Sequence, residues 1–136
     1  MQFKLSFCDP FKKEIVELGD ISGEKIIESF ENIQWTDYLK RMENVNQSDI
    51  YYSPSFEIEN KENKNGLSIS AVGTPLAFEY YIFYRRPKIR KKLFGLMNTM
   101  DENYLTDVTG QTKKDALDCL NALKNNNLGF LDNKVK

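Results

Sequence analysis

The feature that most constrains the fold is a series of short alternating segments joined by short turns. Residues 55–59 and 67–71 each alternate apolar with polar side chains, and the polar stretch 60–66 separates them. Alternation with a period of two predicts half-buried strands. The two segments therefore predict a hairpin, in which Asn65 and Gly66 supply the positive backbone φ angles that the turn needs.

Four further segments favour strands by alternation or by β-branched and aromatic content. They are residues 1–7, 13–18, 78–84 and 104–108, the last as a short edge strand. Proline lacks the N–H that a strand donates, so Pro87 is expected to end the aromatic strand. Residues 93–100 show no firm periodicity and fit either a short helix or an ordered loop.

Two segments show helical periodicity. Apolar positions recur on one face from residue 24 to 42, with a bend expected near 32–34 and Ser22 as a candidate N-cap. The second helix begins after Thr112, and Asp115 completes a short capping box. Its expected buried stripe is Ala116, Cys119, Leu120 and Leu123. Residues 128–131 are expected to fold back on the core, leaving residues 133–136 outside it.

These elements predict one α+β domain over residues 1–136, with two layers: an antiparallel sheet and helices packed on one face. A chain of this length buries about two-thirds of its unfolded surface, enough for one core. No apolar run approaches the ~20 residues that span a bilayer, and the N-terminal residues lack the apolar segment of a signal peptide. We expect a cytoplasmic protein that does not bind membranes.

The absence of histidine limits the possible chemistry. It excludes Ser-His-Asp and Cys-His catalytic sites and histidine-containing zinc sites. Cys8 and Cys119 are expected to be inert apolar residues, and Glu57 with Glu59 fits a solvent-facing strand better than a pair of catalytic or metal-binding carboxylates. We therefore expect no enzyme activity, no metal and no cofactor.

The charges are unevenly distributed along the chain. Residues 9–62 hold thirteen acidic and six basic residues, whereas residues 63–100 hold one acidic and seven basic residues. The overall net charge is only −1. Such asymmetry concerns partners and their steering rather than the fold.

The acidic half supplies the first candidate binding surface. Glu24, Glu28 and Glu31 recur at helical spacing and form an exposed stripe, which is suited to a basic protein partner or is only a solvated face. Four aromatic residues are expected to serve as binding anchors beside this stripe: Trp35, Tyr38, Tyr51 and Tyr52. For Trp35 and Tyr38, the alternative is that they pack in the core.

The basic centre supplies the alternative surface. Six of the eight residues 85–92 are basic, and they follow an aromatic strand. Cations beside aromatic rings suit single-stranded nucleic acid. The candidate residues are Tyr81, Tyr84, Arg85, Arg86, Lys88, Arg90, Lys91 and Lys92. The isoelectric point of about 5.6 favours a protein partner over nucleic acid, and a solvated or internally paired loop is the other interpretation.

Two segments, Ser53–Pro87 and Tyr104–Leu123, resemble bacterial immunity proteins of polymorphic toxin systems. They share a hairpin, an aromatic strand and a Thr-Gly turn into a terminal helix. The resemblance implies a small, non-enzymatic α+β protein that binds and blocks a cognate toxin domain. It carries over no binding residue. If the toxin is a basic nuclease, the acidic stripe is the expected docking surface.

Overall fold

The computed structural model describes the backbone of residues 2–92 and 97–136, and the side chains of residues 2–88 and 103–136. Its strands form a single antiparallel sheet in the order β2-β1-β3-β4-β5-β6. The strands are β1 (Gln2–Cys8), β2 (Val16–Ser22), β3 (Ser55–Asn60), β4 (Gly66–Thr74), β5 (Ala77–Lys92) and β6 (Met97–Gln111).

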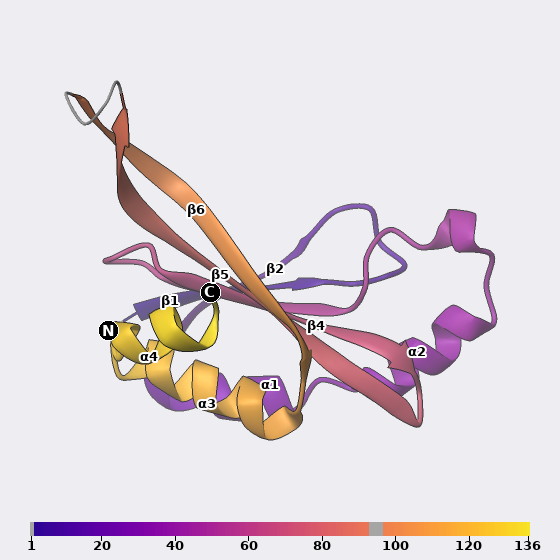
Figure 1. Ribbon diagram of the computed structural model, residues 1–136. Helices are drawn as coiled ribbons and strands as arrows, with labels where there is room; N and C mark the ends of the chain where they lie inside the picture. Colours follow the sequence, from indigo (N-terminus) through magenta and orange to yellow (C-terminus); the bar gives the residue numbers. More distant parts are fainter. Residues whose placement is uncertain (1, 93–96) are drawn as a thin grey trace.

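The helices cover one face of this sheet (Figure 1). They are α1 (Ile26–Glu31), α2 (Trp35–Glu43), α3 (Lys113–Lys124) and α4 (Leu128–Lys134), with short 3-10 turns at Gly23–Lys25 and Gln47–Asp49. The predicted α+β fold, with an antiparallel sheet and helices on one face, is confirmed. The expected bend near residues 32–34 separates α1 from α2.

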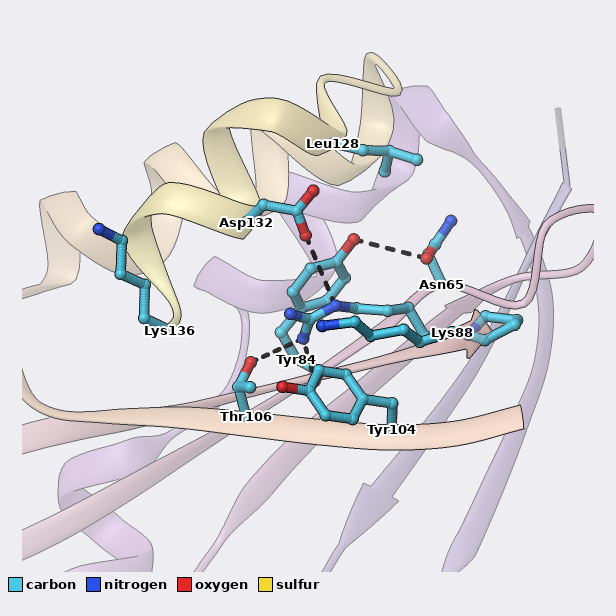
Figure 2. Close-up of a pocket in the computed structure, with 10 residues that line it drawn as sticks. Asn65, Tyr84, Lys88, Tyr104, Thr106, Leu128, Asp132 and Lys136 are labelled. Carbon is cyan, nitrogen blue, oxygen red and sulfur yellow. Dashed lines mark hydrogen bonds and ion pairs between the residues drawn. The ribbon is translucent and has the colours of Figure 1, made fainter. Parts of the chain in front are cut away.

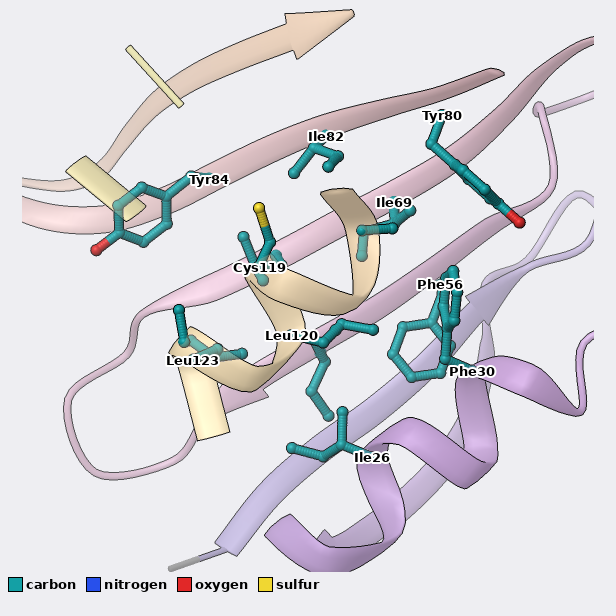
Figure 3. Close-up of a cluster of buried hydrophobic side chains, with 14 of the residues drawn as sticks. Ile26, Phe30, Phe56, Ile69, Tyr80, Ile82, Tyr84, Cys119, Leu120 and Leu123 are labelled. Carbon is teal, nitrogen blue, oxygen red and sulfur yellow. The ribbon is translucent and has the colours of Figure 1, made fainter. Parts of the chain in front are cut away.

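The core lies between the sheet and the helices (Figure 3). Phe30 of α1 is fully buried, and its ring centroid lies 5.5 Å from those of Phe56 and Trp35 and 5.6 Å from that of Tyr80. The predicted stripe of α3 is buried at all four positions. The apolar residues that alternate along the strands and those that recur every 3.6 residues along the helices thus pack together in one cluster.

Helix α3 begins with the predicted capping box. The side chain of Thr112 accepts a hydrogen bond from the backbone N–H of Asp115, and the Asp115 carboxylate accepts one from the Thr112 N–H at 2.9 Å. Lys134 of α4 donates to the same carboxylate at 3.1 Å. The backbone bond from Thr112, followed by the bond from Lys134, lowers the pKa of Asp115 to about 2.

Asp115→Asn is expected to lower the free energy of unfolding by about 1 kcal/mol near neutral pH. Because the folded-state pKa is depressed, the stabilisation is present above the unfolded pKa of ~3.9 and is lost as the pH falls towards 2. Urea titrations of both proteins at pH 6 and pH 2 measure the difference. A difference that is equally large at both pH values contradicts this assignment.

The main correction concerns strand β5. It does not end at Pro87 but runs to Lys92, and the expected edge strand at 104–108 is part of the much longer β6. The pairing register shifts between Arg86 and Lys88, so Pro87 lies at an irregularity where a ladder hydrogen bond is already missing. Met97–Met100 are strand rather than helix or loop, and residues 93–96 lie outside the described residues.

Three smaller expectations also differ from the structure. Strand β2 occupies residues 16–22 rather than 13–18, and its pairing register with β1 shifts between Leu5 and Ser6. In the β3–β4 turn the positive φ belongs to Lys64, not to Asn65 or Gly66. Val135 is fully buried, so the C-terminal residues are not all outside the core.

Candidate functional site

The predicted acidic stripe is exposed but diluted by basic residues. Glu24 lies in the 3-10 turn before α1, and Glu28 and Glu31 lie on α1. Lys25 approaches Glu28 at 3.6 Å, and Lys113 of α3 approaches Glu31 at 3.6 Å. Lys25 is a local i,i+3 neighbour of Glu28, but Lys113 reaches the stripe only because α3 packs beside α1, which sequence spacing alone does not reveal.

The four aromatic residues predicted beside this stripe differ in how far they are exposed. Trp35 is buried against Phe30 and Tyr80, so the core alternative holds for it and it is not a surface anchor. Tyr38 is half-buried and packs on Phe7, with 5.2 Å between ring centroids. Tyr51 is exposed, whereas the half-buried Tyr52 donates to the backbone oxygen of Lys13 at 2.7 Å.

A shallow groove lies beside Tyr38. It has a volume of about 550 Å³ and is lined by the α1–α2 connection and the outer face of α2. The Arg41 guanidinium at its end lies 4.3 Å from the ring centroid of Phe11. The groove carries both an acid, Asp37, and bases, so its charge indicates no particular partner.

The predicted basic surface is split between the two faces of the sheet. Side chains alternate along β5. Arg85 points to the uncovered face and approaches Glu59 at 3.8 Å, whereas Tyr84 and Arg86 lie on the helix-covered face. Tyr84 is only 1% exposed, so its ring is not available to stack on a base. The side chains of Arg90, Lys91 and Lys92 lie outside those that the structure describes.

Strands β5 and β6 continue as a two-stranded arm beyond the rest of the sheet (Figure 1). Arg85 is the last residue of β5 that pairs with β4, and from Arg86 onward β5 pairs with β6 alone. We define the arm as residues 86–92 and 97–104. It contains five basic and two acidic residues.

A pocket of about 510 Å³ lies at the root of this arm, between the sheet and α4 (Figure 2). Its centre is Arg86, whose guanidinium carbon lies 4.1 Å from the ring centroid of Tyr84 and 4.7 Å from that of Tyr104. Arg86 Nη1 donates to Thr106 Oγ1 at 2.6 Å and to the Tyr84 carbonyl at 3.2 Å. Two rings and two oxygens thus fix the guanidinium. We call this site the root pocket.

Two further residues define the electrostatics of the root pocket. Asp132 of α4 places Oδ1 3.5 Å from Arg86 Nε, and Lys88 places its ammonium group 4.4 Å from the ring centroid of Tyr104. Lys136 also lines the pocket, but its ammonium group points away from Arg86 (Figure 2), so two cations, Arg86 and Lys88, face the Asp132 carboxylate there. The site therefore favours an anion.

Sequence reasoning missed Tyr104, Thr106 and Asp132. Tyr104 and Thr106 reach the pocket because they pair across the strands with Arg86 and Tyr84. That register depends on two irregularities in the β5–β6 ladder, which no local sequence pattern reveals. Asp132 arrives with α4 through tertiary packing.

The carboxylates of the uncovered face are engaged within the chain. Glu57 accepts hydrogen bonds from the Ser68 hydroxyl at 2.8 Å and the Cys8 thiol at 3.5 Å, while Glu59 faces Arg85. These contacts suit cross-strand stabilisation of a sheet. Among the residues that the structure describes, no cluster of acidic and cysteine side chains is arranged to hold a metal ion.

The candidate nucleophiles are deactivated by their surroundings. Burial, followed by the charge of Glu57, raises the pKa of the Cys8 thiol to about 12. Burial likewise raises the pKa of Cys119 to about 11 and those of Tyr80 and Tyr84 to about 12. Both thiols and both phenols are therefore protonated near neutral pH.

Iodoacetamide is expected to leave both cysteines unmodified in the folded protein at pH 8. With these pKa values, roughly one thiol in a thousand or fewer is ionised, and the thiolate is the reactive form. Intact-mass spectrometry should show no adduct in the native protein and two adducts in guanidinium chloride. Rapid modification of either native cysteine contradicts this result.

No helix in the described parts of the chain is long and apolar enough to cross a bilayer. Comparison with known proteins gives no assignment: no family model, no curated protein and no solved structure matches the chain.

Proposed function

We propose that the protein is a non-enzymatic binding protein of the immunity kind, which neutralises a cognate toxin by direct contact. The observation that carries the proposal is the β5–β6 arm. The deactivated thiols and phenols described above add support, because they offer no nucleophile for an enzyme.

In an isolated chain the arm is expected to be only marginally stable. A two-stranded ribbon is marginally stable in water, and its strand edges present unpaired backbone groups. Beyond Arg85, no other described strand pairs with either edge of this ribbon. A partner that covers the arm would satisfy these groups, so the arm is best explained as a docking element.

The charge of the arm changes the partner that we expect. A basic nuclease would suit the acidic stripe, but that stripe is diluted by Lys25 and Lys113. The arm is basic and therefore suits an acidic surface on the toxin domain. We propose that the arm, rather than the stripe, makes the decisive contact.

Co-expression with the toxin domain encoded by a neighbouring gene tests the proposal. In the arm-shortened variant, residues 89–100 are replaced by Asn-Gly, so that a two-residue turn joins the paired residues Lys88 and Asp101. The wild type should protect cells, and the shortened variant should not. A thermal unfolding curve with a sharp transition shows that the shortened protein still folds.

Charge reversal provides the matched comparison. The triple variant Glu24→Lys, Glu28→Lys and Glu31→Lys changes the acidic stripe and leaves the arm intact, and it should still protect. Loss of protection in this triple variant, with protection retained in the arm-shortened variant, places docking on the stripe and contradicts the proposal. Failure of the wild type to protect against any neighbouring toxin contradicts the function itself.

Nucleic-acid binding is the second candidate, because the arm is rich in basic residues. It predicts binding to single strands that weakens steeply between ~50 and ~200 mM salt, since each neutralised phosphate releases counterions. The burial of Tyr84 and the division of the basic residues between two faces weigh against it. Fluorescence anisotropy with a labelled oligonucleotide distinguishes the two functions, since an immunity protein should show no binding at low salt.

A further inference from the structure

We infer that the root pocket receives a carboxylate side chain of the protein partner, which takes the place of Asp132 beside Arg86. The inference rests on the proposed function and names the chemistry of one contact within it. It follows from three properties of the pocket: a fixed guanidinium, a weakly held internal carboxylate and an excess of positive charge.

Arg86 is held in place before any ligand arrives. Its side chain is only 12% exposed, and it is bound by the rings of Tyr84 and Tyr104 and by two oxygen acceptors. Such fixation reduces the entropy that binding must otherwise remove. A guanidinium is planar and matches the planar carboxylate group.

Asp132 holds only a loose contact with this guanidinium. Its Oδ1 lies 3.5 Å from Arg86 Nε, whereas a charge-assisted hydrogen bond is about 2.7–2.9 Å long. The Asp132 side chain is 58% exposed, and ion pairs at such sites contribute at most about 1 kcal/mol. Asp132 can therefore rotate into solvent at little cost while another carboxylate enters.

The remaining charges favour the incoming group. With Asp132 displaced, Lys88 remains in the pocket beside Arg86, whereas the Lys136 ammonium group points away from both (Figure 2). Lys88 is already placed beside the ring of Tyr104, on the arm that we propose as the docking element. An acidic residue of the partner that contacts the arm would thus meet two cations, Arg86 and Lys88.

The geometry favours a protein carboxylate over a nucleic-acid phosphate. Nucleic-acid grooves combine cations with aromatic faces on which bases stack. Here the faces of Tyr84 and Tyr104 are occupied by Arg86, and Lys88 also lies on Tyr104, so the rings orient cations instead. The pocket offers an anion contact without a stacking platform.

An acidic peptide and an oligonucleotide test the inference without the toxin. The probes are acetyl-Glu-Asp-Glu-Asp-amide and a thymidine pentanucleotide, each titrated into the full-length protein and followed by the NMR signal of Arg86 Nε–Hε or, in Arg86→Lys, by that of the Lys88 backbone amide. The peptide should shift this signal saturably. Asp132→Asn should bind it several-fold more tightly, because the internal competitor loses its charge, and Arg86→Lys should bind it several-fold more weakly.

Matched variants separate pocket binding from general attraction. Lys113→Gln removes a positive charge on α3, away from the pocket, and should leave the affinity unchanged, whereas Lys88→Gln should weaken it. Asp132 is exposed, so Asp132→Asn remains informative if Arg86→Lys disturbs folding. Equal peptide affinity in the wild type, Asp132→Asn and Lys88→Gln overturns the inference. Tighter binding of the oligonucleotide at the Arg86 signal also overturns it, in favour of phosphate.

The same variants separate this inference from the proposed function. With the toxin domain, Asp132→Asn should bind more tightly and Lys88→Gln more weakly than the wild type. If the wild type protects cells but these variants bind the toxin equally well, only the pocket inference fails. If the peptide behaves as expected but no neighbouring toxin is neutralised, the proposed function fails, and with it the assignment of the carboxylate to a toxin.

Discussion

Phe30→Ala is expected to lower the free energy of unfolding by about 3–5 kcal/mol, a large share of the stability of a domain this size. The side chain is fully buried between the sheet and the helices. Its ring meets Phe56 edge-on, with an interplanar angle of 87°, and also contacts Trp35 and Tyr80. Removing it leaves a cavity that three rigid aromatic rings cannot fill. Urea unfolding followed by tryptophan fluorescence measures the loss.

The chain offers a matched control for this substitution. Phe130→Ala makes the same chemical change on α4, where the side chain is 36% exposed, and should cost much less. Phe30→Leu keeps part of the buried volume and should fall between the two. Equal losses for Phe30→Ala and Phe130→Ala would show that the aromatic cluster is not the centre of the core.

Local patterns predicted the elements whose stability is set locally. Alternation marked β1 and the β3–β4 hairpin, and helical periodicity with the Thr112–Asp115 capping box marked α3. Each of these signals depends on residues only a few positions apart. For the same reason the α+β fold class followed from the sequence, since short turns between strands require antiparallel neighbours.

The arm could not be predicted in this way. Pro87 is a sound reason to end a strand, because it removes a backbone donor. Its effect depends on whether that donor is needed, and at the register shift beside Arg86 it is not. Register shifts depend on the partner strand, so their position is absent from the local pattern of β5.

The root pocket depends on still longer-range information. Arg86 meets Tyr104 and Thr106 through the register of two long strands, and meets Asp132 through the packing of α4. The sequence identified Arg86 and Lys88 as basic residues of interest. It did not indicate that one is fixed between two rings while Arg85, the preceding residue, faces the opposite side of the sheet.

The tight turn between β4 and β5 provides the second large expected effect, through Gly73→Ala. Gly73 has a φ of +135°, and an added Cβ would lie 2.6 Å from the Ala77 carbonyl oxygen and 2.8 Å from the Phe78 Cα. Both atoms belong to the backbone of the paired strand, so neither can move without disturbing the ladder. Backbone strain of about 1–3 kcal/mol and overpacking of similar size should together lower the free energy of unfolding by about 3 kcal/mol or more.

Two other glycines allow the strain and the steric clash at Gly73 to be separated. Gly19 has a φ of +90° but nothing within 4 Å of its added Cβ, so Gly19→Ala should show strain alone, about 1–2 kcal/mol. Gly129 lies in α4 without positive φ or close neighbours, so Gly129→Ala should be neutral or stabilising. Chemical denaturation of the three variants should therefore rank Gly73→Ala as the least stable and Gly129→Ala as the most stable. If Gly73→Ala loses no more than Gly19→Ala, the β4–β5 turn relaxes around the new methyl group. In that case the close contact between Gly73 and β5 would not stabilise the pairing of β4 with the start of β5, the strand that continues into the arm.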